Sequence, residues 1–375
     1  MLNALFKPTP EVRAQATAWG TWPGDMQVVG GRTVDSTSAM QLLAVSGCVR
    51  YISDTISTLP VDVYLQRGNE RVEDTVPAWL KRPAIDSDII DTLSQVCTSL
   101  LLHGNAYIVV MRLGLQILEL HVVDPCTIRV THAGGRKRYL INGTEYDGEI
   151  LHIPGMMLPG CHTGLSPLEY ARQSISLGLT ALEYGNDSLM SGNNMPGVIE
   201  LPGAAQPDIM KAMGENWRRQ RSGKKNRGLP GVLESGATWK ATGVTNEQAQ
   251  FLQTRQWTAA EICGQVYLVD PSELGIPVTG TSIQYGNMEQ RQIATTRRAL
   301  QPWMIRIEKA FSSLLSLNRY MKFNLDGLLR ADSNARWDVY GKAMTINTQA
   351  AALGQPLVLG TAEMRDFEDL GKAAQ

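Results

Sequence analysis

Apolar residues follow a helical period from Ser38 onward and then switch to the alternation of a strand. The helical run contains Met40, Leu43, Val49, Ile52 and Ile56, and the LPVDVYL that follows it alternates. A second helix is predicted over Asp91 to Leu102, ending at His103-Gly104-Asn105, because glycine commonly terminates a helix. These patterns predict two helices, each followed by a strand.

Short strand-like runs dominate the next part of the chain, each too brief for a helix and separated from the next by turn-forming residues. They are AYIVVMR, ILELHVV, TIRVTH, RYLING and EILHIP. The chain to about Pro154 is therefore predicted to be a mixed α+β unit. The first thirty or so residues, with Pro8, Pro10 and Pro23 and no sustained period, predict an arm instead.

The most regular helical pattern begins at Ser166-Pro167-Leu168-Glu169, where serine suits the cap, proline the first turn and glutamate the third position. Its apolar stripe consists of Leu168, Ala171, Ile175, Leu179 and Leu182. Gly178 and Gly185 lie inside this helix, and each glycine makes the helix about 1 kcal/mol less stable than alanine would. Either neighbouring helices approach closely there or the glycines are simply tolerated.

An irregular stretch after Gly192 separates this helix from a second one. Thr245 and Gln248 resemble another capping box, and the helical pattern runs on to about Leu268. A segment without charge follows from Leu274 to Met288, and it is predicted to be a loop. The two helices thus bracket a small inserted module.

A third helix is predicted to begin at Asn287 to Gln290, with Pro302 causing a kink because proline removes a helical hydrogen bond. Its apolar stripe consists of Leu300, Trp303, Ile307, Ala310, Phe311 and Leu314. YMKFNLDGLLRAD then predicts a strand or hairpin, and the remainder is predicted to be helical, with a break at Gly354-Gln355-Pro356.

The composition is that of a folded protein, since 43% of the 375 residues are hydrophobic and 19% are charged. No run approaches the roughly 20 apolar residues of a membrane span, and the start lacks the apolar core of a signal peptide. The five cysteines, Cys48, Cys97, Cys126, Cys161 and Cys263, are widely spaced. They predict buried thiols in a reducing cytoplasm, without a disulfide framework.

Motifs for catalysis, cofactors or metals do not emerge from the pattern. No phosphate-binding G-x-x-x-x-G-K-[ST] occurs, Ser166 is better explained as a helix cap than as a nucleophile, and the neighbours Cys161 and His162 do not make a catalytic pair. The histidines never show the H-x-x-x-H spacing of a metal helix. Neither an enzyme, nor a cofactor, nor a metal site is predicted.

Positive charge concentrates in one run inside the bracketed module, with no acidic residue between Glu215 and Glu234. The run consists of Arg218, Arg219, Arg221, Lys224, Lys225 and Arg227. It is either a solvated loop or a contact with DNA phosphate or with an acidic patch on a partner. The sequence leaves these readings open.

The order of these parts resembles the tailed-bacteriophage portal family of the Hong Kong ninety-seven type, from about Ser38 to the end. His103-Gly104-Asn105-Ala106-Tyr107 is similar to its G-N-A-Y segment, and Gly164-Leu165-Ser166-Pro167-Leu168 to its G-x-S-P-L helix start. Other similar strings are Met195 to Ile199, Glu261 to Gly275, Tyr285 to Gln290, Leu300-Gln301-Pro302, Ile307-Glu308 and Ala362 to Arg365. The chain departs from the family's F-G-V-P-P at Gln265 to Pro271 and has Ala362 where asparagine is usual.

The resemblance implies an α+β portal fold with a wing, a helical stem, a clip and a short helical crown, assembled as a ring of twelve copies. The expected order is an N-terminal arm (1–37), the first part of the wing (38–163), a stem helix (164–194), the clip (195–244), a stem helix (245–272), the tunnel loop (273–287), the rest of the wing (288–333) and the crown (334–375).

The implied function is that of the DNA channel at one capsid vertex of the virion, assembled in the host cytoplasm. The implied partners are double-stranded DNA, the large subunit of the terminase motor, the major capsid protein and the head-tail connector. Thr279, Gly280, Thr281, Ser282 and Gln284 of the tunnel loop are expected to face the channel, and the basic run to lie on the clip.

The net charge of −1 is compatible with such a channel, because each lysine or arginine that neutralises a phosphate would add sliding friction. Two other classes remain open at this point. One is a capsid-associated or scaffolding protein that assembles without conducting DNA. The other is a nuclease, for which Asp366, Glu368 and Asp369 are the nearest carboxylate cluster.

Overall fold

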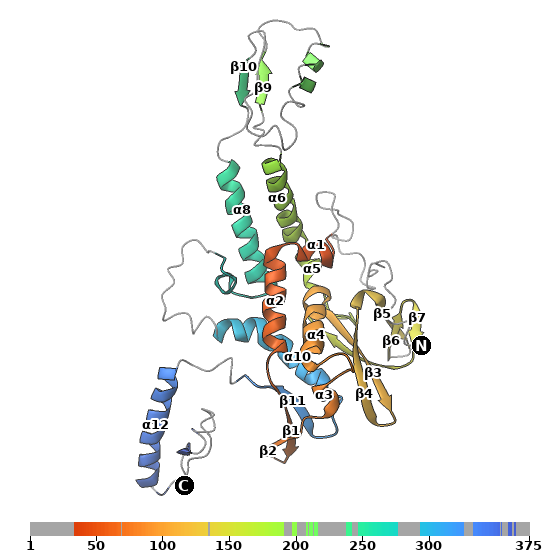
Figure 1. Ribbon diagram of the computed structural model, residues 1–375. Helices are drawn as coiled ribbons and strands as arrows, with labels where there is room; N and C mark the ends of the chain where they lie inside the picture. Colours follow the sequence, from red (N-terminus) through yellow and green to blue (C-terminus); the bar gives the residue numbers. More distant parts are fainter. Residues whose placement is uncertain are drawn as a thin grey trace.

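The computed structural model describes residues 34–68, 70–133, 136–190, 197–200, 238–241, 247–276, 293–325 and 333–352, with isolated residues at 208–216 and after 352. In Figure 1 the described elements form a mixed helix and sheet body from which two long helices project. The chain is thus of the α+β class, as predicted.

The first predicted helix is in fact two helices, α1 (Ser36–Met40) and α2 (Leu43–Ser57). Asp35 starts α1 by a capping box, in which Ser38 N donates to Asp35 Oδ1 (2.6 Å) and Asp35 N donates to Ser38 Oγ (2.9 Å). Leu42 then has extended backbone, with φ −77° and ψ 118°, and this interrupts the helical hydrogen bonds before α2 begins. Apolar periodicity continues across the interruption, which is why the pattern alone suggested one helix.

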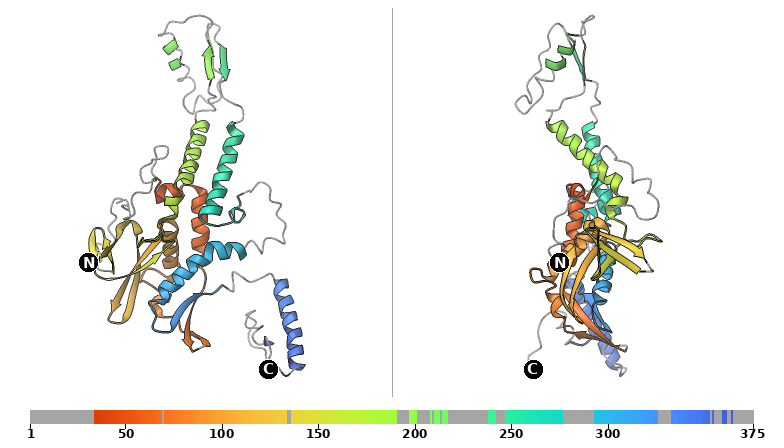
Figure 2. Two further views of the ribbon diagram at one scale, coloured as in Figure 1. Left: turned by 180° about the vertical axis from the view of Figure 1, so that it is seen from behind. Right: turned by 90° about the vertical axis from the view of Figure 1, so that its right-hand side faces the viewer.

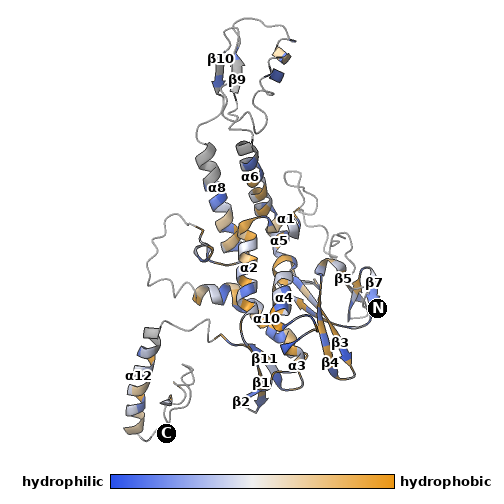
Figure 3. Cartoon of the chain, in the orientation of Figure 1, coloured by the Kyte–Doolittle hydropathy of each residue, from blue (hydrophilic) through white to orange (hydrophobic). Residues whose placement is uncertain are grey.

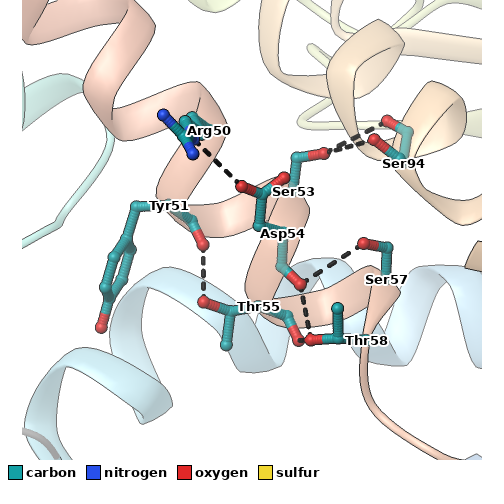
Figure 4. Close-up of polar contacts among 8 residues, drawn as sticks. All are labelled: Arg50, Tyr51, Ser53, Asp54, Thr55, Ser57, Thr58 and Ser94. Carbon is teal, nitrogen blue, oxygen red and sulfur yellow. Dashed lines mark hydrogen bonds and ion pairs between the residues drawn. The ribbon is translucent and has the colours of Figure 1, made fainter.

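α2 packs against α4 (Ile89–His103) through apolar residues, and both helices are rich in them in Figure 3. A polar contact joins the two helices as well, since Ser53 Oγ lies 3.0 Å from Ser94 Oγ. Figure 4 also shows the exposed Arg50–Asp54 ion pair on α2 (3.2 Å). α4 begins at Asp88, which accepts from Asp91 N, and ends at Gly104 as predicted.

Four small antiparallel sheets account for the described strands. The first has the order β11-β1-β2, and the second, β4-β3-β8, carries the buried strand β3. The third, β5-β6-β7, extends from the second, and β9 pairs with β10 at the far end of the two projecting helices. Their bounds are β1 Val61–Arg67, β2 Glu70–Asp74, β3 Asn105–Leu113, β4 Gln116–Val123, β5 Ile128–Ala133, β6 Arg136–Ile141, β7 Thr144–Tyr146, β8 Glu149–Pro154, β9 Gly197–Glu200, β10 Thr238–Ala241 and β11 Arg319–Phe323. A short helix, α3 (Ala78–Lys81), lies beside β4.

The projecting helices are α6 (Arg172–Met190) and α8 (Glu247–Glu261), which lie side by side in Figures 1 and 2. The helix predicted from Ser166 starts instead as a separate turn, α5 (Pro167–Tyr170), which is separated from α6 at Ala171. The predicted side-chain cap at Ser166 is wrong, because its Oγ donates to Leu102 O (2.7 Å). The second helix ends before Leu268, in a π-helical turn over Ile262–Val266, and a 3-10 turn (Pro271–Leu274) follows.

The third predicted helix consists of a π-helical segment (Thr296–Leu300) and α10 (Gln301–Ser312). Pro302 lies in the first turn of α10, directly after the π-helical segment. The irregularity beside the proline is therefore a π-helical turn directly before α10. Beyond β11, α12 (Ser333–Ala352) confirms helix in the C-terminal part.

One continuous core joins the body to the base of the projecting helices. Ile52 of α2, Leu100 of α4 and Phe311 of α10 are fully buried in it, and so is Ile175 of α6. Ile262 and Cys263 at the end of α8 belong to the same cluster. None of the described helices is both long and apolar enough to cross a membrane.

The cysteine prediction is only partly right. Cys48, Cys97 and Cys263 are buried as free thiols, whereas Cys126 is exposed and Cys161 is half-buried. Cys126 and Cys161 both follow proline- or glycine-containing turns at the surface, which a count of cysteines does not indicate.

Candidate functional site: the helix pair and its junction

The two projecting helices join the body at three glycines that lie against one another. Gly104 ends α4 in the left-handed conformation (φ 67°), and a Cβ on it would overlap Leu165 O. A Cβ on Gly164 would overlap Gly104 O, and one on Gly155 would lie 2.9 Å from the same oxygen. Because glycine has no side chain, the backbone segments around Gly104, Gly155 and Gly164 can meet just before α5.

Asn105 fastens the junction with its side chain, which is almost fully buried. Gly164 N donates to Asn105 Oδ1 (2.7 Å), and Asn105 Nδ2 donates to Gly164 O (2.8 Å) and to His103 O (3.1 Å). One amide thereby satisfies backbone groups on both sides of the junction. The first residue of β3 and the residues before α5 are held in a fixed relation.

Two further side chains tie neighbouring elements to the same place. Ser166 Oγ donates to Leu102 O, and Arg306 of α10 donates to Gly155 O (2.8 Å). The backbone N–H of Gly155 donates to Gly104 O (2.8 Å). The junction therefore collects α4, β3, β8, α5 and α10.

His152 completes the network from strand β8. It lies 3.0 Å, through Nε2, from Asn105 Oδ1, and its ring stacks on Tyr107 at 4.5 Å. Burial, together with the charge of Lys137 nearby, lowers the pKa of His152 to about 3. The imidazole is thus neutral at pH 7, and its Nε2–H is the group that donates to Asn105.

The helix pair itself approaches closely at Gly178. A Cβ there would lie 3.1 Å from a methyl group of Leu42 and 3.4 Å from Thr258 of α8. Of the two interpretations of this glycine, the structure confirms close approach. Leu42 reaches it from the interruption between α1 and α2, so the same extended residue that precedes α2 also packs against the helix pair.

An apolar strip lies on the outer surface of the pair. Trp257 of α8 is 60% exposed and Leu177 of α6 is 45% exposed, and the two line an open groove together with Gln253 and Thr254. Tyr184, about two helical turns further along α6, is 55% exposed. Large apolar side chains on projecting helices are typical of a surface that another protein covers.

The residues predicted to act on DNA cannot be placed. Thr279, Gly280, Thr281, Ser282 and Gln284 lie outside the described residues, and so do Arg218, Arg219, Arg221, Lys224, Lys225 and Arg227. Thr245 and the carboxylates Asp366, Glu368 and Asp369 also lie outside them.

The sequence shows the family-like strings around Asn105 and Gly164, but nothing in it indicates that the two are in contact. The bond between Gly164 and Asn105 spans 59 positions, and no periodicity reports such a pairing. His152 and Arg306 were not singled out at all. The only available signal was the glycine before Asn105, which predicted the end of α4.

Comparison with known proteins bears on what this arrangement is for. The family model described as "Phage portal protein" matches residues 43–356, which is most of the chain. The chain belongs to the phage portal protein family. A probable portal protein of Streptomyces phage phiC31 is 36% identical over 355 residues, covering 87% of this chain and 77% of that relative. The portal protein of Enterobacteria phage HK97 is 24% identical over 326 residues, covering 82% and 76%.

Solved structures share the portal fold. A portal protein of the HK97 family from Corynebacterium diphtheriae has a TM-score of 0.62 at 16% identity, covering 80% of this chain and 99% of that one. The neck of a native gene transfer agent particle, computed with C12 symmetry, has a TM-score of 0.54 at 21% identity, covering 90% and 94%. The family resemblance inferred from the sequence is confirmed, and the chain is a portal subunit.

Proposed function

We propose that copies of this portal protein assemble into a ring, of twelve subunits as in the C12 neck, that conducts double-stranded DNA through one vertex of the virion. In this arrangement α6 and α8 form the stem, residues 195–244 the clip, residues 273–287 the tunnel loop, and the C-terminal helix the crown. The ring assembles in the host cytoplasm and catalyses no reaction itself.

The observation that carries the proposal is the apolar strip on the helix pair. Trp257 and Leu177 project from two helices whose bases are fixed in the core, and the described part of the chain leaves both side chains exposed. Side-by-side packing of stems would cover them, and closed rotational symmetry is the common outcome of such repeated contacts. A ring of stems encloses a bore.

The charges of the helix pair suit a bore through which DNA slides. The two helices carry Arg172 and Arg255 against Glu183, Asp187, Glu247 and Glu261. Every cation that binds a phosphate adds salt-dependent affinity, and a row of them would hold the duplex in place. A stem with few cations and a slight acidic excess offers DNA little to grip.

Electron microscopy of the purified protein tests the assembly. Wild-type protein should form closed rings with a pore wide enough for a duplex, whereas Trp257→Asp combined with Leu177→Asp should leave folded single subunits. The matched control is Gln256→Asp, an exposed position beside Trp257, which should still form rings. Open or solid assemblies of the wild-type protein, or intact rings of the double variant, would contradict the proposed contact.

We propose further that the basic run of the clip, Arg218 to Arg227, contacts the terminase large subunit during packaging and the head-tail connector afterwards, and that the wing contacts the major capsid protein. Reversing the charge of Arg218, Arg219 and Arg221 should then reduce DNA packaging. Unchanged packaging would indicate that the run is only a solvated loop. Replacing Thr279, Thr281, Ser282 or Gln284 with lysine should slow DNA passage if the tunnel loop faces the bore.

A further inference from the structure

Three side chains with metal-binding atoms meet where α4 ends and where β4 leads into β5. They are His103, Asp124 and Cys126, and their donor atoms all lie within 4.8 Å of one another. His103 Nδ1 is 3.8 Å from Cys126 Sγ. Within the described part of the chain, no other set of three such residues converges in this way.

Both segments that carry these side chains are held in place by the backbone around them. His103 is the last residue of α4, fixed by the cap at Gly104 and by the bond from Asn105 to its carbonyl. Asp124 and Cys126 flank Pro125 in a 3-10 turn, where Cys126 N donates to Asp124 Oδ1 (2.9 Å). A ligand would therefore find these groups already gathered and would order little additional chain.

We propose that His103, Asp124 and Cys126 bind a divalent zinc ion, with a water molecule in the fourth position. In tetrahedral zinc sites the bonds to sulfur and nitrogen are about 2.3 Å and 2.0 Å, which separates the two atoms by roughly 3.6 Å. The distance of 3.8 Å between Cys126 Sγ and His103 Nδ1 is close to that value. The thiol and imidazole favour zinc over calcium or magnesium, which take oxygen ligands.

Asp124 can serve the turn and the ion together. A carboxylate has about four lone-pair sites, so accepting one backbone hydrogen bond leaves capacity for a metal. The hydrogen bond to Cys126 N also orients the carboxylate beside the thiol. The turn is thus part of the site instead of competing with it.

The ion would reinforce a weakly attached part of the wing. The sheet β5-β6-β7 packs on its neighbour through a small cluster in which only Val109, Val123 and Ile141 are buried. A metal bond between the turn that begins β5 and the end of α4 would link this sheet directly to the main core. Zinc should accordingly raise the melting temperature of the protein, since a ligand that binds only the folded state stabilises it.

The test is a titration of metal-free protein with Co²⁺, a spectroscopic substitute for zinc, followed by competition with Zn²⁺. Wild-type protein should bind one Co²⁺ per chain, with a thiolate-to-cobalt charge-transfer band that Zn²⁺ abolishes. Cys126→Ser should lose this band. Asp124→Asn, which keeps a capping side chain on the turn, should bind at least about tenfold more weakly.

A second surface thiol provides the matched control. Cys161 adjoins His162, whose ring stacks on His132 at 4.2 Å, but these three do not form a converging set of donor atoms. Cys161→Ser should retain the band, the stoichiometry and the zinc-dependent rise in melting temperature. If instead Cys126→Ser retains the band, if Cys161→Ser loses it, or if wild-type protein binds no Co²⁺, the proposed site is wrong.

Discussion

Asn105 and Gly164 exchange two hydrogen bonds, from Gly164 N to Asn105 Oδ1 (2.7 Å) and from Asn105 Nδ2 to Gly164 O (2.8 Å). Through this pairing the first residue of β3 and the segment before α5 are held together. The two family-like strings G-N-A-Y and G-x-S-P-L therefore meet in space through Asn105 and Gly164. Asparagine is suited to it because its amide both donates and accepts.

Replacing Asn105 with alanine should lower the free energy of unfolding by about 1–3 kcal/mol, because the N–H and carbonyl of Gly164 lose their partner in a buried place. Asn105→Asp should also destabilise, since a carboxylate cannot donate to Gly164 O. Urea denaturation measures both effects. Asn186→Ala, at an exposed position of α6, is the control and should change the stability by less than about 0.5 kcal/mol. Equal stability of Asn105→Ala and wild type would mean that the hydrogen bonds between Asn105 and Gly164 do not stabilise the fold.

Gly164→Ala should be more damaging than an ordinary glycine substitution, because the new methyl group would overlap Gly104 O. We expect poor folding or a large drop in melting temperature, measured by circular dichroism. Gly341→Ala, in α12, meets nothing within 4 Å and should be neutral or raise stability by up to about 1 kcal/mol. Similar behaviour of the two variants would count against a crowded junction.

Glu308 links α10 to β11 from a buried position. Its carboxylate accepts from Lys322 Nζ (2.5 Å) and from Phe323 N (3.0 Å). Glu308→Ala should cost about 2 kcal/mol and Glu308→Gln about half of that, because glutamine still accepts from Phe323. Glu149→Gln, which breaks the more exposed ion pair with Arg112, should cost less than about 1 kcal/mol in the same unfolding assay. A larger loss of stability in Glu149→Gln than in Glu308→Ala would show that burial does not determine how much these carboxylates stabilise the fold.

Thr258 presents the opposite case, a buried hydroxyl with no hydrogen-bond partner among the described residues. Thr258→Val keeps the shape of the side chain and removes the unsatisfied group, so it should stabilise the α6–α8 packing by about 1 kcal/mol. Chemical denaturation of Thr258→Val and wild type measures this difference in the free energy of unfolding. A loss of stability would indicate that the hydroxyl finds a partner in solution.

Acid should weaken the junction through His152. Its pKa falls from the ordinary 6.5 to about 3 in the folded chain, so between these values the unfolded chain carries more protons. The free energy of unfolding then decreases as the pH falls from 6.5 towards 3, by up to about 1.4 kcal/mol per pH unit. His152→Gln still donates to Asn105 but does not titrate, and it should show a shallower slope below pH 6.5. Plotted against pH, the free energies of unfolding of wild type and His152→Gln should run parallel above pH 7. Identical slopes below pH 6.5 would rule out a contribution from His152.

The sequence revealed the helices and strands well, because each has a clear period and a local start or stop, such as Gly104 after α4. It could not distinguish a long helix from two helices in line, as at Leu42 and Ala171, since apolar spacing continues through a single residue with non-helical backbone. The π-helical turns at Ile262–Val266 and Thr296–Leu300 likewise leave no composition signal.

The candidate sites were harder to predict because they depend on distant pairs. His103 lies 23 positions from Cys126, and neither spacing nor composition brings the two together. The hydroxyl of Ser166 was predicted to cap its helix, but in the fold it donates to a distant carbonyl, Leu102 O. Family resemblance filled part of this gap, because its strings mark positions that share contacts in space.

The shared core at the base of α6 and α8 joins the helix pair firmly to the body. With Ile175, Ile262 and Cys263 buried among the residues of α2 and α10, the pair cannot pivot unless the surrounding body turns with it. α6 is about 28 Å long, so a rotation of about 5° at its base would displace its tip by roughly 2.5 Å. A rotation of the body around α2 and α10 would thus move the far end of the helix pair further than it moves the base.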